Sequence, residues 1–158
     1  MKLEQTADGS YTLYVPELDE HYHSVKGALT ESQHIFIEMG LKHSPVSEPH
    51  ILEIGLGTGL NAFLTLLSAE ETRRKVHYTG IERYPLAEET LKQLDYPRLI
   101  GKQHEEDYYA IHQAPWDTET EVSPWFTLHK IEDDFTRLFN PVEGSRPAVP
   151  LYLSLIHI

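Results

Sequence analysis

The glycine-rich stretch EIGLGTGLN, from Glu53 to Asn61, constrains the fold more than any other part of the sequence. It lies between an apolar run typical of a buried strand and a segment with the apolar spacing of an amphipathic helix. Gly55, Gly57 and Gly59 carry no Cβ atom, so the backbone can turn tightly there and lie close to a ligand. The amides that open the following helix can bind an anionic group. This order of strand, glycine loop and helix predicts a nucleotide-binding α/β domain.

The spacing of the glycines distinguishes between two kinds of cofactor. The dinucleotide fingerprint requires glycine or alanine three positions after the second glycine, and this chain has Leu60 there. An acidic residue followed by Gly-x-Gly-x-Gly, as at Glu53, is instead the pattern of S-adenosylmethionine-dependent methyltransferases. The sequence therefore favours S-adenosylmethionine over NAD.

A second apolar run, VHYTGIE, predicts another buried strand that ends at Glu82. A carboxylate at the tip of the second strand of a nucleotide-binding sheet hydrogen-bonds the hydroxyl groups of ribose. The alternative is that Glu53 and Glu82 are ordinary charges at strand ends. The ordered combination of a glycine loop and an acid-tipped strand favours the cofactor site.

Three blocks of the sequence resemble one family. They are the segment from Asp19 to Leu41, the glycine loop and the run ERYPL from Glu82 to Leu86. They resemble the methyltransferase that makes 5-methylaminomethyl-2-thiouridine at the tRNA wobble position, which is the MnmC methyltransferase domain or its stand-alone form MnmD. In the first block, the positions of the family motif are occupied by Asp19, Tyr22, Ser24, Gly27, Glu31, Ser32 and Phe36. The resemblance covers roughly residues 10 to 139.

The resemblance implies a Rossmann-like class I methyltransferase fold, in which a mainly parallel sheet is flanked by helices and preceded by an N-terminal β-hairpin. It implies S-adenosyl-L-methionine as cofactor and tRNA as partner. The implied cofactor-binding residues are Glu53, Gly55, Gly57, Thr58, Gly59, Asn61, Glu82 and Asp134, and the implied substrate residues are Asp19, Tyr22, Ser24 and Glu31. The family's Gly-Asp pair aligns with Asp133-Asp134, which leaves open which of the two contacts adenine. Asp134 is preferred because it occupies the carboxylate position.

Periodicity and turn residues place the other elements. We expect a hairpin around Asp8-Gly9 and a segment at 99–123 that is helical or irregular, whose aromatic residues pack in the core or stack on a base. The expected helices span 27–42, 60–75 and 86–94, and the expected strands span 50–54, 76–82 and 126–135. The aromatic residues in question are Tyr108, Tyr109, Trp116 and Trp125.

The end of the chain does not match a complete methyltransferase sheet, which has about seven strands and roughly 200 residues. The family's next block, Asp-[AG]-Phe-[AS]-Pro, is absent, so the catalytic residues are unknown. The closing LSLIHI resembles a translated sequencing adapter, or else is a short apolar strand. We therefore expect three parts, an N-terminal hairpin and helix at 1–48, a partial cofactor domain at 49–150 and a non-native tail at 151–158. Such a fragment is expected to be inactive and to fold poorly or expose a sheet edge.

Composition bears on the partners. A formal net charge of −12 is unusual for a tRNA enzyme, because Lys and Arg supply much of the affinity for nucleic acid. The tight basic cluster at 73–75 is expected to complement the dipole of the preceding helix. The absence of cysteine excludes disulfides and thiol catalysis.

No apolar run is long enough to span a membrane, so we expect a soluble cytoplasmic domain. His21 and His23 near Asp19 lack an ordered third ligand, and no metal is expected. Two other functions stay open, a methyltransferase for a small molecule or protein and a non-catalytic nucleotide-binding module. The oligomeric state and a fused FAD oxidase domain also stay open.

Overall fold

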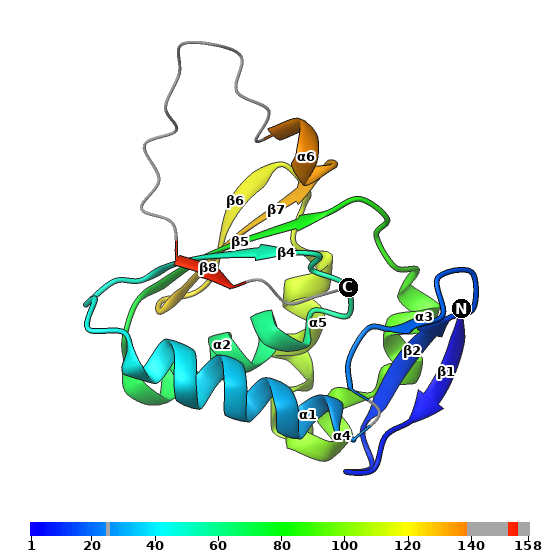
Figure 1. The fold of residues 1–158 in the computed structure, drawn as a ribbon. Helices are drawn as coiled ribbons and strands as arrows, with labels where there is room; N and C mark the ends of the chain where they lie inside the picture. The colour runs from blue at the N-terminus through cyan, green and yellow to red at the C-terminus, as the bar shows by residue number, and fades with distance from the viewer. Residues whose placement is uncertain (25, 139–151, 155–158) are drawn as a thin grey trace.

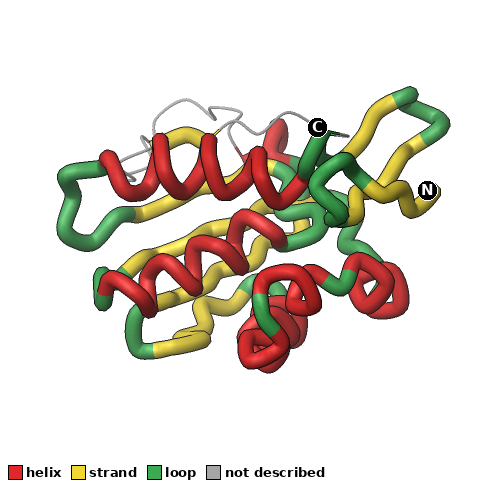
Figure 2. Tube along the Cα trace, turned by 90° about the horizontal axis from the view of Figure 1, so that it is seen from below, coloured by secondary structure: helices red, strands yellow, loops and turns green. Residues whose placement is uncertain are grey.

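A five-stranded sheet forms the centre of the computed structural model, which describes residues 1–24, 26–138 and 152–154 (Figure 1). The strand order is β6-β7-β5-β4-β8, and only β6 is antiparallel to its neighbour. Helices α2 and α5 lie on one face of this sheet, as the view from below also shows (Figure 2). The predicted Rossmann-like α/β class is confirmed. The strands are β4 (His50–Ile54), β5 (Val76–Glu82), β6 (Thr118–Ser123), β7 (Phe126–Glu132) and β8 (Tyr152–Ser154).

The predicted N-terminal hairpin is confirmed and gains a short third strand. Its strands β1 (Lys2–Gln5), β2 (Tyr11–Val15) and β3 (Glu20–His21) form a separate antiparallel sheet. The turn carries Asp8, whose carboxylate accepts hydrogen bonds from the amide and the hydroxyl of Thr30, both at 2.8 Å. These bonds attach the hairpin turn to the start of the first helical segment.

The helix predicted at 27–42 is present, but its centre is a π-helix. The segment consists of α1 (Ala28–Glu31), η1 (Ser32–Gly40) and the 3₁₀ turn η2 (Leu41–His43). Ile35 and Met39 lie on the outer face of this segment, where their side chains are 60% and 59% exposed. A π-helix closes its turns with i to i+5 bonds, and this changes which residues share one face. The buried residues near the centre are Phe36 and Ile37.

Arg74 makes contacts that the sequence did not predict. Helix α2 (Leu60–Thr72) ends where Arg73 adopts a left-handed conformation, with φ of 52°. The guanidinium of Arg74 donates to the carbonyl oxygens of Leu41 at 2.9 Å and Ser44 at 2.8 Å, and also to Val46. It therefore holds the end of the neighbouring helical segment and the residues that follow it, a contact that the dipole prediction did not include.

The region at 99–123 contains a strand that the sequence did not predict. A 3₁₀ turn η3 (Lys102–His104) leads into helix α5 (Glu105–Gln113), and β6 then pairs with β7. Of the aromatic residues considered for base stacking, Tyr108 is fully buried in the core. The ring of Trp116 lies against the Lys130 ammonium, 4.7 Å from ring centroid to Nζ.

The remaining helices are short. Helix α3 (Glu88–Leu94) begins two residues later than predicted and ends before Tyr96, as predicted. Asp95 then turns the chain into α4 (Tyr96–Ile100), and α6 (Phe135–Leu138) follows β7. Among the described residues, no helix has the length and apolar character needed to cross a membrane. Residues 139–151 lie outside the described residues, and so does the predicted tail except for residues 152–154 of β8.

Candidate functional site

The glycine loop joins the carboxyl end of β4 to the start of α2. Gly55, Gly57 and Gly59 all have positive φ, at 82°, 51° and 71°, and side chains are strained in this region. The Gly55 amide donates to the carbonyl of Ile81 at 2.8 Å, which ties the loop to the end of β5. Gly59 is the N-cap residue of α2. The backbone conformation thus accounts for glycine at all three positions.

The carboxylate at the end of β5 lies against this loop. Glu82 is 7% exposed, and its Oε2 accepts a hydrogen bond from the Gly57 amide at 2.9 Å. Its Oε1 accepts from the amide of Tyr84 at 2.8 Å. A carboxylate oxygen has more than one acceptor direction, so both oxygens retain capacity for a further donor. The structure therefore brings the glycine loop and Glu82 together, as the two motifs predicted.

Glu53 points into the protein and not toward the surface of the loop. It is 2% exposed and accepts hydrogen bonds from Asn61 Nδ2 at 2.8 Å and from the Tyr78 hydroxyl at 2.6 Å. Burial raises the pKa of Glu53 to about 7, against the opposing effect of these two hydrogen bonds. Asn61 Oδ1 is buried and has no partner among the described residues. This free acceptor lies in the first turn of α2, directly after the glycine loop.

Thr58, at the centre of the loop, is held by two distant segments. Its hydroxyl lies 3.0 Å from His23 Nε2, and its carbonyl accepts a hydrogen bond from the Tyr108 hydroxyl at 3.2 Å. Burial lowers the pKa of His23 to about 4, so this imidazole is neutral near pH 7. His23 was not predicted as a site residue, and Tyr108 was considered only for core packing or base stacking and not for a contact with the loop. No local motif marks them, because each lies far from Thr58 in the sequence.

Aromatic rings also lie against the two glycines on either side of Thr58. A Cβ atom on Gly57 would lie 2.9 Å from the ring of Tyr22, and one on Gly59 would lie 2.8 Å from the ring of His112. His112 was not predicted, and its Nε2 is buried without a partner among the described residues. Glycine is therefore required here both by the backbone conformation and by the space that the rings occupy.

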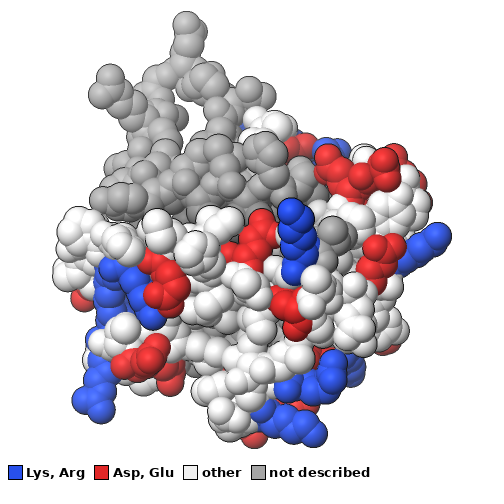
Figure 3. Space-filling model, turned by 60° about the horizontal axis from the view of Figure 1, so that its bottom comes forward, with Lys and Arg blue, Asp and Glu red and all other residues white. Residues whose placement is uncertain are grey.

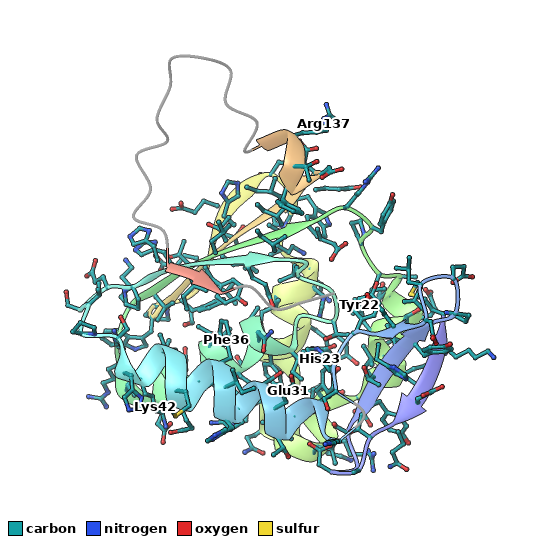
Figure 4. The ribbon with its side chains drawn as sticks, in the orientation of Figure 1. Tyr22, His23, Glu31, Phe36, Lys42 and Arg137 are labelled. Atoms are coloured by element: carbon teal, nitrogen blue, oxygen red, sulfur yellow. The ribbon has the colours of Figure 1, made fainter. Side chains whose placement is uncertain are left out.

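The four predicted substrate residues lie in three places. Tyr22 reaches the glycine loop, and the Ser24 amide donates to Glu31 Oε2 at 3.1 Å. Asp19 is exposed in the turn before β3, where it accepts a hydrogen bond from the Tyr14 hydroxyl at 2.8 Å. Figure 4 shows Tyr22 and His23 beside the hairpin sheet, with Glu31 near the start of the helical segment. The described contacts do not join Asp19 to the other three.

The two candidate adenine contacts follow β7. Asp134 forms an ion pair with Arg83 at 2.8 Å. Hydrogen bonds from the hydroxyl and amide of Thr136, with the charge of Arg83, hold the pKa of Asp134 below its ordinary value. Asp133 accepts from the Asp134 amide at 2.7 Å and lies 3.7 Å from Arg137. Arg83 directly follows Glu82, so its ion pair links the carboxyl ends of β5 and β7.

The position of the loop in the sheet agrees with a ligand site. β4 pairs with β5 on one side and with β8 on the other, and in open α/β sheets ligands bind at the carboxyl ends of strands where the strand order reverses.

A separate groove of about 740 Å³ lies between η1 and α2, and its lining includes no residue of the glycine loop. Among the described residues, no group of three or more potential ligands is placed to hold a metal ion.

The fold and the glycine loop define an α/β protein of the Rossmann-like class. Within this class the chain is similar to the bifunctional protein MnmC of tRNA 5-methylaminomethyl-2-thiouridine biosynthesis. The protein from Magnetococcus marinus is 34% identical over 94 residues, which are 54% of this chain and 14% of the relative. The protein from Pseudomonas entomophila is 31% identical over 109 residues, 61% of this chain and 17% of the relative. The resemblance that the sequence motifs indicated is thereby confirmed.

A solved structure extends the similarity to most of the chain. The crystal structure of MNMC2 from Aquifex aeolicus matches with a TM-score of 0.68 and 25% identity, over 90% of this chain and 45% of that chain. The chain thus spans less than half of this structural relative and about a seventh of the first curated relative. No protein-family model matches the chain.

Proposed function

We propose that this chain carries the cofactor-binding part of an S-adenosylmethionine-dependent methyltransferase that acts on a tRNA wobble uridine. The observation that supports this most is the contact between Glu82 and the Gly57 amide, which brings an acid-tipped strand to a glycine loop whose glycines all have positive φ. This arrangement suits a ligand with a ribose next to the loop. The similarity to MnmC supports 5-aminomethyl-2-thiouridine as the acceptor.

The residues at the loop fit this cofactor. The free Asn61 Oδ1 offers a buried acceptor in the first turn of α2, suited to the ammonium group of the methionine part. Glu82 would bind the ribose hydroxyls, and Asp134 would accept a hydrogen bond from the adenine amino group. Glu53 would act through Asn61, because its carboxylate fixes the side-chain amide so that Oδ1 is left free. Gly55, Gly57, Thr58 and Gly59 would form the backbone wall of the pocket.

S-adenosylmethionine supplies an electrophilic methyl group on its sulfonium. The protein positions an amine nucleophile in line with it, and the amine must be deprotonated because a primary amine is largely protonated near neutral pH. Tyr22 lies against Gly57, so it is placed between the cofactor loop and the N-terminal segment. Asp19, Ser24 and Glu31 stay proposed substrate residues. We assign no proton acceptor among the described residues.

The acidic composition favours a second candidate, a methyltransferase for a small molecule. The net charge is −12, and the face shown in Figure 3 carries acidic and basic side chains interspersed, without a continuous basic area over the described residues. Phosphate contacts usually require such an area. Transfer of a labelled methyl group to tRNA that lacks the modification would support the first candidate, and transfer only to small amines would support the second.

Titration calorimetry with S-adenosylmethionine tests the cofactor assignment. The wild-type chain should bind it, and Glu82→Ala should weaken binding by at least about tenfold because the hydrogen bonds to the ribose are lost. Glu88→Ala is the matched control, since Glu88 is an exposed glutamate of α3 whose described ion pair is with Lys92. Absence of binding by the folded wild-type chain would overturn the proposal.

A further inference from the structure

We propose that His23 is a positioning residue, which holds the glycine loop in its binding conformation through Thr58. The inference rests on the proposed cofactor function. It names a residue outside the glycine loop that sets the affinity of the loop for the proposed cofactor. His23 Nε2 lies 3.0 Å from Thr58 Oγ1, and the two residues are 35 positions apart in the sequence. Thr58 is 1% exposed, so its hydroxyl has little access to water as an alternative partner.

Thr58 is the residue of the loop that these long-range contacts fix. It lies between Gly57 and Gly59, which lack a Cβ atom and therefore have wide conformational freedom in an unrestrained chain, although both have positive φ here. Fixing the Thr58 side chain on one side and its carbonyl on the other restricts both adjoining peptide planes. The Gly57 amide, which donates to Glu82, lies in the next peptide plane toward the N-terminus. A loop held in advance loses less conformational entropy when a ligand binds.

His23 itself is well fixed. Its backbone amide donates to the Thr12 hydroxyl at 2.9 Å, and that hydroxyl donates back to the His23 carbonyl at 3.2 Å. Thr12 lies on β2 and is fully buried. The hairpin sheet is thereby connected to the glycine loop by a short series of hydrogen bonds. The next residue in the chain, Ser24, is bonded to Glu31, so the segment with the proposed substrate residues shares this connection.

The test is a double-mutant cycle on S-adenosylmethionine affinity. His23→Ala and Thr58→Val should each weaken binding about tenfold, and the double variant should be no weaker than the weaker single variant. His23→Gln keeps a side-chain amide at a similar reach and should restore affinity to within about threefold of wild type. His21→Ala is the matched control, because His21 lies two residues away and bonds to Glu4 at 2.9 Å on the hairpin. It should bind like wild type.

Hydrogen exchange of the free chain gives a second readout that needs no ligand. The amides of residues 55–61 should exchange faster in His23→Ala than in wild type, whereas those of β4 and β5 should not change. Unaltered exchange in the loop, or additive losses of affinity in the cycle, would overturn the inference. If the wild-type chain fails to bind the cofactor, the proposed function fails, and the exchange experiment alone decides the role of His23.

Discussion

The buried carboxyl of Glu53 makes the stability of the protein depend on pH in a predictable way. Burial raises its pKa to about 7 in the folded chain, against an ordinary value of 4.5. The folded state therefore binds a proton more tightly than the unfolded state. The free energy of unfolding should fall as pH rises from about 4.5 to about 7 and then level off. The pKa difference corresponds to a loss of about 3 kcal/mol.

Replacing Glu53 with glutamine isolates this effect. Glutamine keeps a carbonyl acceptor for Asn61 Nδ2 and offers an amide to the Tyr78 oxygen, but it has no charge to bury. The wild type should be close to Glu53→Gln in stability near pH 5 and should fall below it by about 3 kcal/mol at pH 8. His23 and His112 have lowered pKa values, which make the fold less stable as pH falls. Both proteins carry these two histidines, so their contribution cancels in the difference between the unfolding free energies of wild type and Glu53→Gln.

Urea unfolding followed by circular dichroism at intervals between pH 5 and pH 8 provides the measurement. Glu71→Gln is the control, because Glu71 is exposed on α2, and its pH profile should follow that of the wild type. If the profiles of wild type and Glu53→Gln run parallel over this range, the carboxyl is already charged at pH 5 and the reasoning from burial is wrong.

Three other features give testable results. Arg74→Ala should lower the free energy of unfolding by about 3 kcal/mol, because three carbonyls lose a charged donor. Arg73 is exposed, so Arg73→Ala should lower it by less than about 0.5 kcal/mol; urea titration compares the two variants. Gly57→Ala should lower the free energy of unfolding by about 1–3 kcal/mol and abolish binding of the proposed cofactor. Gly40→Ala is the control and should be tolerated, because its added Cβ meets no atom closer than 3.5 Å; calorimetry compares the two variants. Burial lowers the pKa of Lys130 to about 8, so the stability of wild type relative to Lys130→Met should rise between pH 8 and pH 10.5, and a flat difference would contradict this assignment.

The sequence predicted the parts of the fold that have a strong local pattern. β4, the glycine loop and β5 were placed correctly because a buried parallel strand is a continuous apolar run and a glycine loop has few alternatives. The edge strand β6 was missed because its sequence TETEVS is polar and largely exposed, and pairing with β7 decides its conformation. The exposure of Ile35 followed from a π-helix that no local pattern marked.

The candidate site was predictable only where the residues belong to motifs. Glu82 and the glycine loop could be joined because the carboxyl ends of neighbouring parallel strands meet at one edge of the sheet. The partners of Glu53 and Thr58 could not be found in this way. Tyr78 lies mid-strand, and Tyr108 lies in a helix where an aromatic residue suggests only core packing.

The hydrogen bonds of Thr58 also bear on how the protein folds. They connect this residue to His23 and Tyr108, which are 35 and 50 positions away. Contacts of such separation form late, because the entropy of closing a long loop must be overcome before the contact stabilises the chain. The glycine loop is short and local in sequence, yet the contacts that hold it come from the hairpin segment and α5, so we expect it to reach its final geometry only after both have docked. If the loop binds S-adenosylmethionine as proposed, we expect affinity for it to report how completely a molecule has folded.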